Sequence, residues 1–175
     1  MPTAEGNLTE PHVLAQAKRR LFPDNGATDT YAVVDTQFAS GQWLAEQPID
    51  SSTKEALAPF NHVRVGSGYP DLVGVRTLDS EFVATDQRSE QLPLVIVEAK
   101  GYTEQGSVDI DQGVIQAHDR LQEANVAFVA APASAISRSA RTLARKLNVG
   151  VLGVGSEGTV DSLDAPRIVG NPSDD

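Results

Sequence analysis

Two short stretches of the chain carry side chains whose types and spacing suit hydrolytic chemistry. The run from Leu94 to Lys100 is short, apolar and rich in β-branched residues, which predicts a buried strand. Side chains alternate between the two faces of a strand, so Glu98 and Lys100 are expected on the same face. A carboxylate and an ammonium group are costly to bury unless they are paired, hydrogen-bonded or bound to a cation. The pair therefore predicts either a functional site or a salt bridge at the end of this strand.

The other stretch begins with a second carboxylate, Asp71. Pro70 fixes its own φ and favours an extended conformation at Tyr69, so Asp71 enters a predicted strand over 72–77 from a rigid turn. We therefore expect three charged groups at the ends of two strands.

The pattern Pro70-Asp71, followed by Glu98-Ala99-Lys100, resembles the PD-(D/E)XK, or restriction-endonuclease-like, nuclease superfamily. The resemblance implies that Asp71 and Glu98 bind one or two divalent cations and that Ala99 contributes its backbone carbonyl. It also implies that Lys100 positions or activates the attacking water. Hard oxygen ligands suit Mg²⁺ or Mn²⁺, which can generate a nucleophilic hydroxide and neutralise charge on a phosphodiester. The competing interpretation is a solvated salt bridge.

The resemblance extends to two helices. In this superfamily a glutamine on the helix after the lysine often supports the lysine or the water, which implies Gln116 first and Gln112 second. A pattern Gln-x-x-x-Tyr found in one branch is not matched, and a solvated helix face explains both glutamines equally well. The superfamily also often carries an acid on its first helix. Glu10 has that position, although an acid there can equally interact with the helix dipole.

Composition restricts the remaining classes of function. The chain has 175 residues and no Cys, which excludes thiolate metal sites and thiol redox chemistry. No apolar run reaches membrane-spanning length and the N-terminus lacks a signal-like apolar region, so a cytoplasmic protein is expected. The net charge of −10 argues against a nucleic-acid partner. However, the acidic residues are dispersed along the chain, as in proteins of salt-loving organisms. Local basic patches are therefore more informative about nucleic-acid binding than the net charge.

The best basic patch lies on a helix predicted over 135–147. Its Arg138, Arg141 and Arg145 follow one another at spacings of three and four, so they share a helix face. They are the candidates for contact with DNA phosphates. The competing interpretation is an ordinary solvated face of an Ala-rich helix.

The order of predicted elements indicates a mixed α/β (α+β) fold. We expect one domain over residues 1–158, with an insertion around 24–60, and a loosely ordered acidic tail over 159–175. A hairpin of strands at 62–65 and 72–77 is expected to continue into Leu94–Lys100. A helix from Ile110, two further strands and the helix over 135–147 complete the chain. The resemblance implies a restriction-endonuclease-like mixed central sheet flanked by helices, with an αβββαβ core plus an extra helix and strand.

These observations predict a metal-dependent endonuclease or phosphodiesterase acting on DNA. The alternative is a catalytically inactive protein of the same fold with a structural or nucleic-acid-binding role. A third possibility, a small acidic domain that binds a protein partner, is favoured only by net charge. Because many members of the superfamily act as dimers, a homodimer is also expected.

Overall fold

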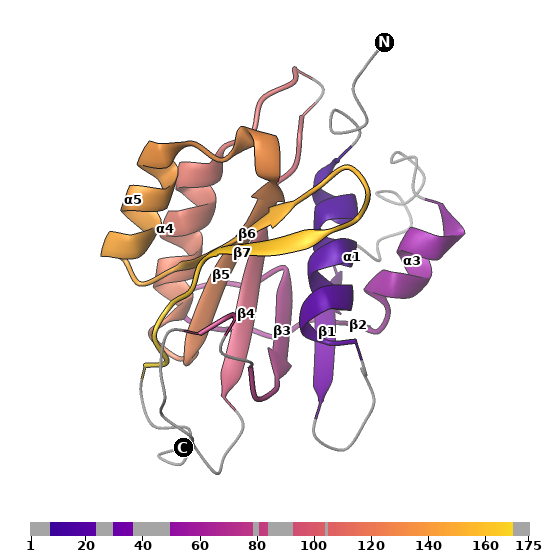
Figure 1. Ribbon diagram of the computed structural model, residues 1–175. Coiled ribbons are helices and arrows are strands. Elements are labelled where there is room, and N and C mark those ends of the chain that lie inside the picture. Colours follow the sequence, from indigo (N-terminus) through magenta and orange to yellow (C-terminus); the bar gives the residue numbers. More distant parts are fainter. Residues whose placement is uncertain are drawn as a thin grey trace.

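The computed structural model describes residues 8–23, 30–36, 50–78, 81–83, 93–103 and 105–169. Over these residues the chain forms a seven-stranded sheet with helices on both faces (Figure 1). The helices are α1 (Glu10–Leu21), α3 (Ser51–Leu57), α4 (Ile110–Arg120) and α5 (Arg138–Lys146), with a 3₁₀ turn η3 (Ala133–Ala135). The strands are β1 (Tyr31–Asp35), β2 (Phe60–Asn61), β3 (Leu72–Val75), β4 (Leu94–Ala99), β5 (Val126–Pro132), β6 (Gly150–Val154) and β7 (Val160–Asp164).

The sheet is mixed, with the strand order β2-β1-β3-β4-β5-β6-β7. Strands β1, β3 and β4 form an antiparallel meander. From β4 the sheet continues through β5 and β6 in parallel, and β7 closes that edge antiparallel to β6. The predicted mixed α/β architecture is confirmed at this level. None of the described helices is long and apolar enough to cross a membrane.

The helices divide the core into two apolar layers. Helix α1 covers one face together with α3, whereas α4 and α5 lie side by side on the other face (Figure 1). Strand β4 alternates between the layers as its sequence predicts, because Val95, Val97 and Ala99 join the α1 side and Ile96 joins the α4 side. Glu98 therefore points toward α4.

The predicted insertion at residues 24–60 includes a strand of the sheet, and its residues 24–29 and 37–49 lie outside the described part of the chain. Within that segment lies β1, which is part of the sheet and lies between β2 and β3. Its successive apolar residues Ala32, Val33 and Val34 are all buried, because both faces of the strand are covered. A strand buried on both faces lacks the alternating pattern that marks a half-exposed one.

The predicted hairpin of 62–65 with 72–77 is wrong. Strand β3 pairs with β1 and β4, and the 62–65 segment contributes only a bridge between Val65 and Gly68. The short loop closed by this bridge instead leads into β3 and contacts the end of α4 through Gly66 and Ser67.

The tail predicted to be loosely ordered over 159–175 contains a strand of the sheet. Residues Val160–Asp164 form β7, and Asp164 accepts hydrogen bonds from Arg141 and Arg145 of α5. Scattered acidic residues in a sequence are typical of a disordered tail. In the folded protein, however, Asp164 has two arginine partners on α5. Residues 170–175 lie outside the described part of the chain.

Helix α5 begins later than the sequence predicts. Its N-cap is Ser137, whose hydroxyl accepts a hydrogen bond from the N–H of Ala140, and η3 occupies the start of the predicted helix. At the other end Asn148 has φ of 56°, a left-handed conformation that ends the helix and that Asn tolerates better than most residues.

Candidate active site at the ends of β3 and β4

Asp71 and Glu98 lie at the ends of two neighbouring strands. Asp71 precedes β3, Glu98 is the fifth residue of β4, and the two strands pair with Leu72 opposite Val97. Both acids are buried, with exposed fractions of 6% and 3%. Sequence analysis predicted these two residues as partners, and the structure brings them together.

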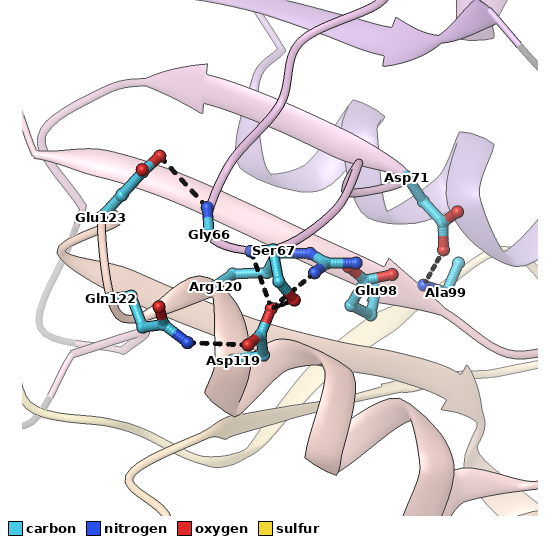
Figure 2. Close-up of polar contacts among 9 residues, drawn as sticks. All are labelled: Gly66, Ser67, Asp71, Glu98, Ala99, Asp119, Arg120, Gln122 and Glu123. Atoms are coloured by element: carbon cyan, nitrogen blue, oxygen red, sulfur yellow. Dashed lines mark hydrogen bonds and ion pairs between the residues drawn. The ribbon is translucent and has the colours of Figure 1, made fainter.

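The Asp71 carboxylate accepts a hydrogen bond from β4 at the point where the pairing of β3 and β4 ends. Continuing the register by two residues places Pro70 opposite Ala99, and Pro has no N–H to donate to the Ala99 carbonyl. The Ala99 N–H donates to Asp71 Oδ2 at 2.8 Å (Figure 2). The N–H and C=O of one residue point to the same side of an antiparallel strand, so the Ala99 carbonyl faces the edge where Asp71 lies. Pro70 supplies no donor to that carbonyl, which suits it to bind a cation.

The two carboxyl groups interact strongly. Burial and the nearby charge of Glu98 raise the pKa of Asp71 well above its ordinary value, although the Ala99 N–H opposes this, and a hydrogen bond to Glu98 raises it further. Burial also raises the pKa of Glu98, while Arg120 and the hydrogen bond from Asp71 favour its ionised form. The pKa values of both carboxyl groups are therefore raised, that of Asp71 more strongly.

Arg120 is a site residue that the sequence analysis missed. Its Nε donates to Glu98 Oε1 at 3.0 Å, and its Nη1 donates to Asp119 Oδ2 at 2.9 Å (Figure 2). The signal was present in the sequence, since Arg120 follows Gly113 and Ala117 at spacings of four and three on the buried side of α4. A charged residue in such a stripe needs a buried partner.

The loop before β3 is held against the end of α4. Ser67 donates to Asp119 Oδ2 from both its N–H, at 3.1 Å, and its hydroxyl, at 2.6 Å. The N–H of Gly66 donates to Glu123 Oε2 at 3.1 Å (Figure 2). Gly66 has φ of 66°, and a Cβ there would lie 2.8 Å from the Asp119 carbonyl oxygen, so the close approach requires glycine.

Lys100 lies on the α4 side of β4, as the alternation predicts. Its aliphatic stem crosses Gly113, where a Cβ would come within 2.9 Å of Lys100 Cγ. Its ammonium donates to Gln112 Oε1 at 3.4 Å. The glutamine in contact with the lysine is thus Gln112, and the first choice from sequence, Gln116, lies one turn further along α4.

Glu10 reaches the same end of the sheet through a close contact between α1 and the end of β4. A Cβ on Gly101 would lie 2.1 Å from the Glu10 nitrogen, so this packing depends on glycine. Burial, together with the negative charge of Asp71, raises the pKa of Glu10 to about 7, and the positive charge of Lys100 partly opposes the shift. Glu10, Asp71, Glu98 and Lys100 therefore form one electrostatic cluster.

Among the described residues, no group of three or more His, Cys, Asp or Glu side chains is arranged to hold a metal ion. The oxygen donors that the structure places together are those of Asp71 and Glu98, with the Ala99 carbonyl at the same edge. Mg²⁺ in proteins commonly retains several waters and uses one or two carboxylates, so such a donor set fits this ion.

The predicted basic patch on α5 is largely paired within the protein. Arg141 and Arg145 form ion pairs with Asp164 at 2.9 and 3.1 Å, whereas Arg138 is exposed and lines a shallow pocket with Lys146. Internal pairing leaves less positive charge for a phosphate than the sequence spacing suggests.

Comparisons of the chain with family models, curated proteins and solved structures found no match.

Proposed function

We propose that the protein is a metal-dependent phosphodiesterase of restriction-endonuclease-like fold that hydrolyses DNA at the Asp71–Glu98 site. The observation that carries this proposal is the pair of buried carboxyl groups in hydrogen-bond contact at adjacent strand ends. Burying two neighbouring carboxyl groups whose pKa values are both raised is unfavourable, and such arrangements concentrate at functional sites. The order α1, β1, β3, β4, α4, β5, with its antiparallel meander and parallel fourth strand, supports the fold assignment.

A divalent cation would be held by Asp71 and Glu98, with the Ala99 carbonyl as a further oxygen donor. Bound Mg²⁺ or Mn²⁺ would lower the pKa of a coordinated water and offset charge on the phosphate. The positive charge would also favour the ionised forms of the two acids, so ion binding and deprotonation of Asp71 are expected to be linked.

The chain itself would orient the reactants. Lys100 lies on the same face as Glu98 and is held by Gln112, which places an ammonium group where it can bind a phosphate oxygen or a water. Arg120 of α4 anchors Glu98 by donating to its Oε1 and so fixes the orientation of this carboxylate. Glu10, whose pKa is about 7, can accept or release a proton near neutral pH.

One observation favours the second candidate, a catalytically inactive protein of the same fold that binds nucleic acid. The Arg120–Glu98 ion pair already neutralises one of the two acids. If this pair persists when cations are present, Glu98 has a structural role and the fold serves only in binding.

The decisive experiment is cleavage of single-stranded, double-stranded and branched DNA with Mg²⁺ or Mn²⁺ over a range of salt concentrations. Glu98→Ala and Lys100→Ala are expected to abolish cleavage while the protein stays folded. Lys54→Ala, which alters an exposed lysine on α3, is the matched control and is expected to retain full activity. Absence of cleavage by the wild type under all conditions, with no cation binding in calorimetry, would overturn the catalytic proposal and favour the binding role.

A further inference from the structure

An exposed aromatic pair lies beside the candidate active site. The rings of His62 and Tyr69 meet edge to face, with centroids 3.9 Å apart and an interplanar angle of 76°. Tyr69 is 46% exposed, and the His62 side chain is 51% exposed. In an edge-to-face contact the rim of one ring meets one face of the other, so each ring keeps at least one flat surface that this contact does not cover.

The backbone on both sides of Tyr69 is fixed. On the N-terminal side, the loop residues Gly66 and Ser67 are bound to the end of α4. On the C-terminal side, Pro70 is rigid and the Asp71 carboxylate binds the Ala99 N–H. An aromatic side chain that is exposed on a fixed backbone loses little conformational entropy when it binds a ligand.

His62 is also fixed by the end of β1. Its Nδ1 shares a hydrogen bond of 2.7 Å with the Thr36 hydroxyl and lies 3.6 Å from Asp35 Oδ1. Asp35 in turn donates its N–H to the Asp71 carbonyl oxygen at 3.1 Å. The aromatic pair therefore belongs to the same end of the sheet as the two acids, and Tyr69 is two residues from Asp71.

We propose that Tyr69, supported by His62, stacks against an unpaired base of the DNA strand that enters the Asp71–Glu98 site. This inference rests on the proposed function and refines its substrate class to DNA with an unstacked base next to the cleaved phosphate, as in single strands, flaps and frayed ends. Bases inside an intact duplex are stacked on their neighbours and cannot present a face to Tyr69. Base–aromatic stacking tolerates any sequence, because every base has a flat π surface.

The test measures binding of a single-stranded oligonucleotide carrying 2-aminopurine, in EDTA, by fluorescence quenching. Tyr69→Leu is expected to weaken binding at least about fivefold, the lower end of the effect of losing one base–aromatic stack. Tyr69→Phe retains the ring and is expected to bind as the wild type does. Tyr31→Leu is the matched control, because Tyr31 is 52% exposed but begins β1 at the opposite end from Asp35.

The supporting role of His62 has its own readout. His62→Ala is expected to reduce both affinity and quenching, whereas His62→Phe restores the ring contact and is expected to recover most of the loss. A role of His62 in overall stability alone would leave the quenching of bound oligonucleotide unchanged.

The stacking proposal is overturned if Tyr69→Leu binds as tightly as the wild type, if bound 2-aminopurine is not quenched, or if the wild type does not prefer single strands to duplex. Failure of the proposed function gives a different result. In that case Tyr69-dependent binding of single strands is present, but no divalent cation produces cleavage that Glu98→Ala abolishes.

Discussion

Replacement of Asp71 by asparagine is expected to stabilise the protein while abolishing its activity. The unfolded chain releases the Asp71 proton around the ordinary value of 3.8, whereas burial and Glu98 raise the pKa of this group in the folded protein. Between these two pKa values the folded state binds one proton more than the unfolded state, so stability falls as pH rises. An asparagine does not titrate, and it can still accept from the Ala99 N–H and donate to Glu98.

The expected gain follows from the cost of retaining that proton. Each unit by which a pKa differs between the folded and unfolded states corresponds to about 1.4 kcal/mol. Single stabilising substitutions commonly yield about 0.5 to 2 kcal/mol. For a domain of this size that corresponds to an increase in melting temperature of about 1 to 8 °C. The gain should be absent below pH 3.8 and largest in alkaline solution.

The assay is thermal unfolding of the wild type and Asp71→Asn across pH, with and without Mg²⁺. Asp161→Asn, an exposed substitution on β7, is the control and is expected to leave the pH dependence unchanged. Added Mg²⁺ should stabilise the wild type and have little effect on Asp71→Asn, because the variant lacks one ligand. A variant that is less stable than the wild type at alkaline pH, or a difference independent of pH, would refute the interpretation of the acid pair.

Three further substitutions test the framework of the site. Arg120→Leu removes the buried partner of Glu98 and is expected to reduce the free energy of unfolding by about 3 to 5 kcal/mol. Adding Glu98→Gln should recover much of that loss in chemical denaturation, and an equal loss in the double variant would contradict the ion-pair explanation. Gly101→Ala is expected to cost about 3 kcal/mol in the same assay, because its Cβ would lie 2.1 Å from the Glu10 nitrogen; a change below about 1 kcal/mol would show that α1 adjusts freely. Glu10→Gln should remove a decrease in wild-type stability between pH 4.5 and about 7, worth about 1 to 2 kcal/mol after solvent screening, and an unchanged pH profile would show that Glu10 ionises normally.

Local sequence rules predicted part of the site correctly. The period of two along β4 placed Glu98 and Lys100 on one face, and Pro70 placed Asp71 at the start of the adjacent strand. These features depend on neighbours only a few residues apart. They can be read from sequence because backbone geometry alone determines them.

Contacts between distant segments were harder to predict. The sequence patch on α5 implied a phosphate surface, but Asp164 of β7 pairs with Arg141 and Arg145. The position of α4 across the sheet decides that Gln112, and not Gln116, contacts Lys100. It also decides that Arg120 pairs with Glu98. Helical spacing indicates which residues share a face but not which face meets a particular strand end.

The sequence by itself therefore determined the mixed α/β class, the alternation of β4 and the approach of Asp71 to the strand ends. Only the tertiary structure decided that β1 belongs to the sheet, that Arg120 is the buried partner of Glu98, and that an aromatic pair lies beside the acids. The physical reason is the range of the interactions. Backbone dihedral preferences and side-chain periodicity act between near neighbours, whereas ion pairing and ring contacts require segments that meet only when the core forms.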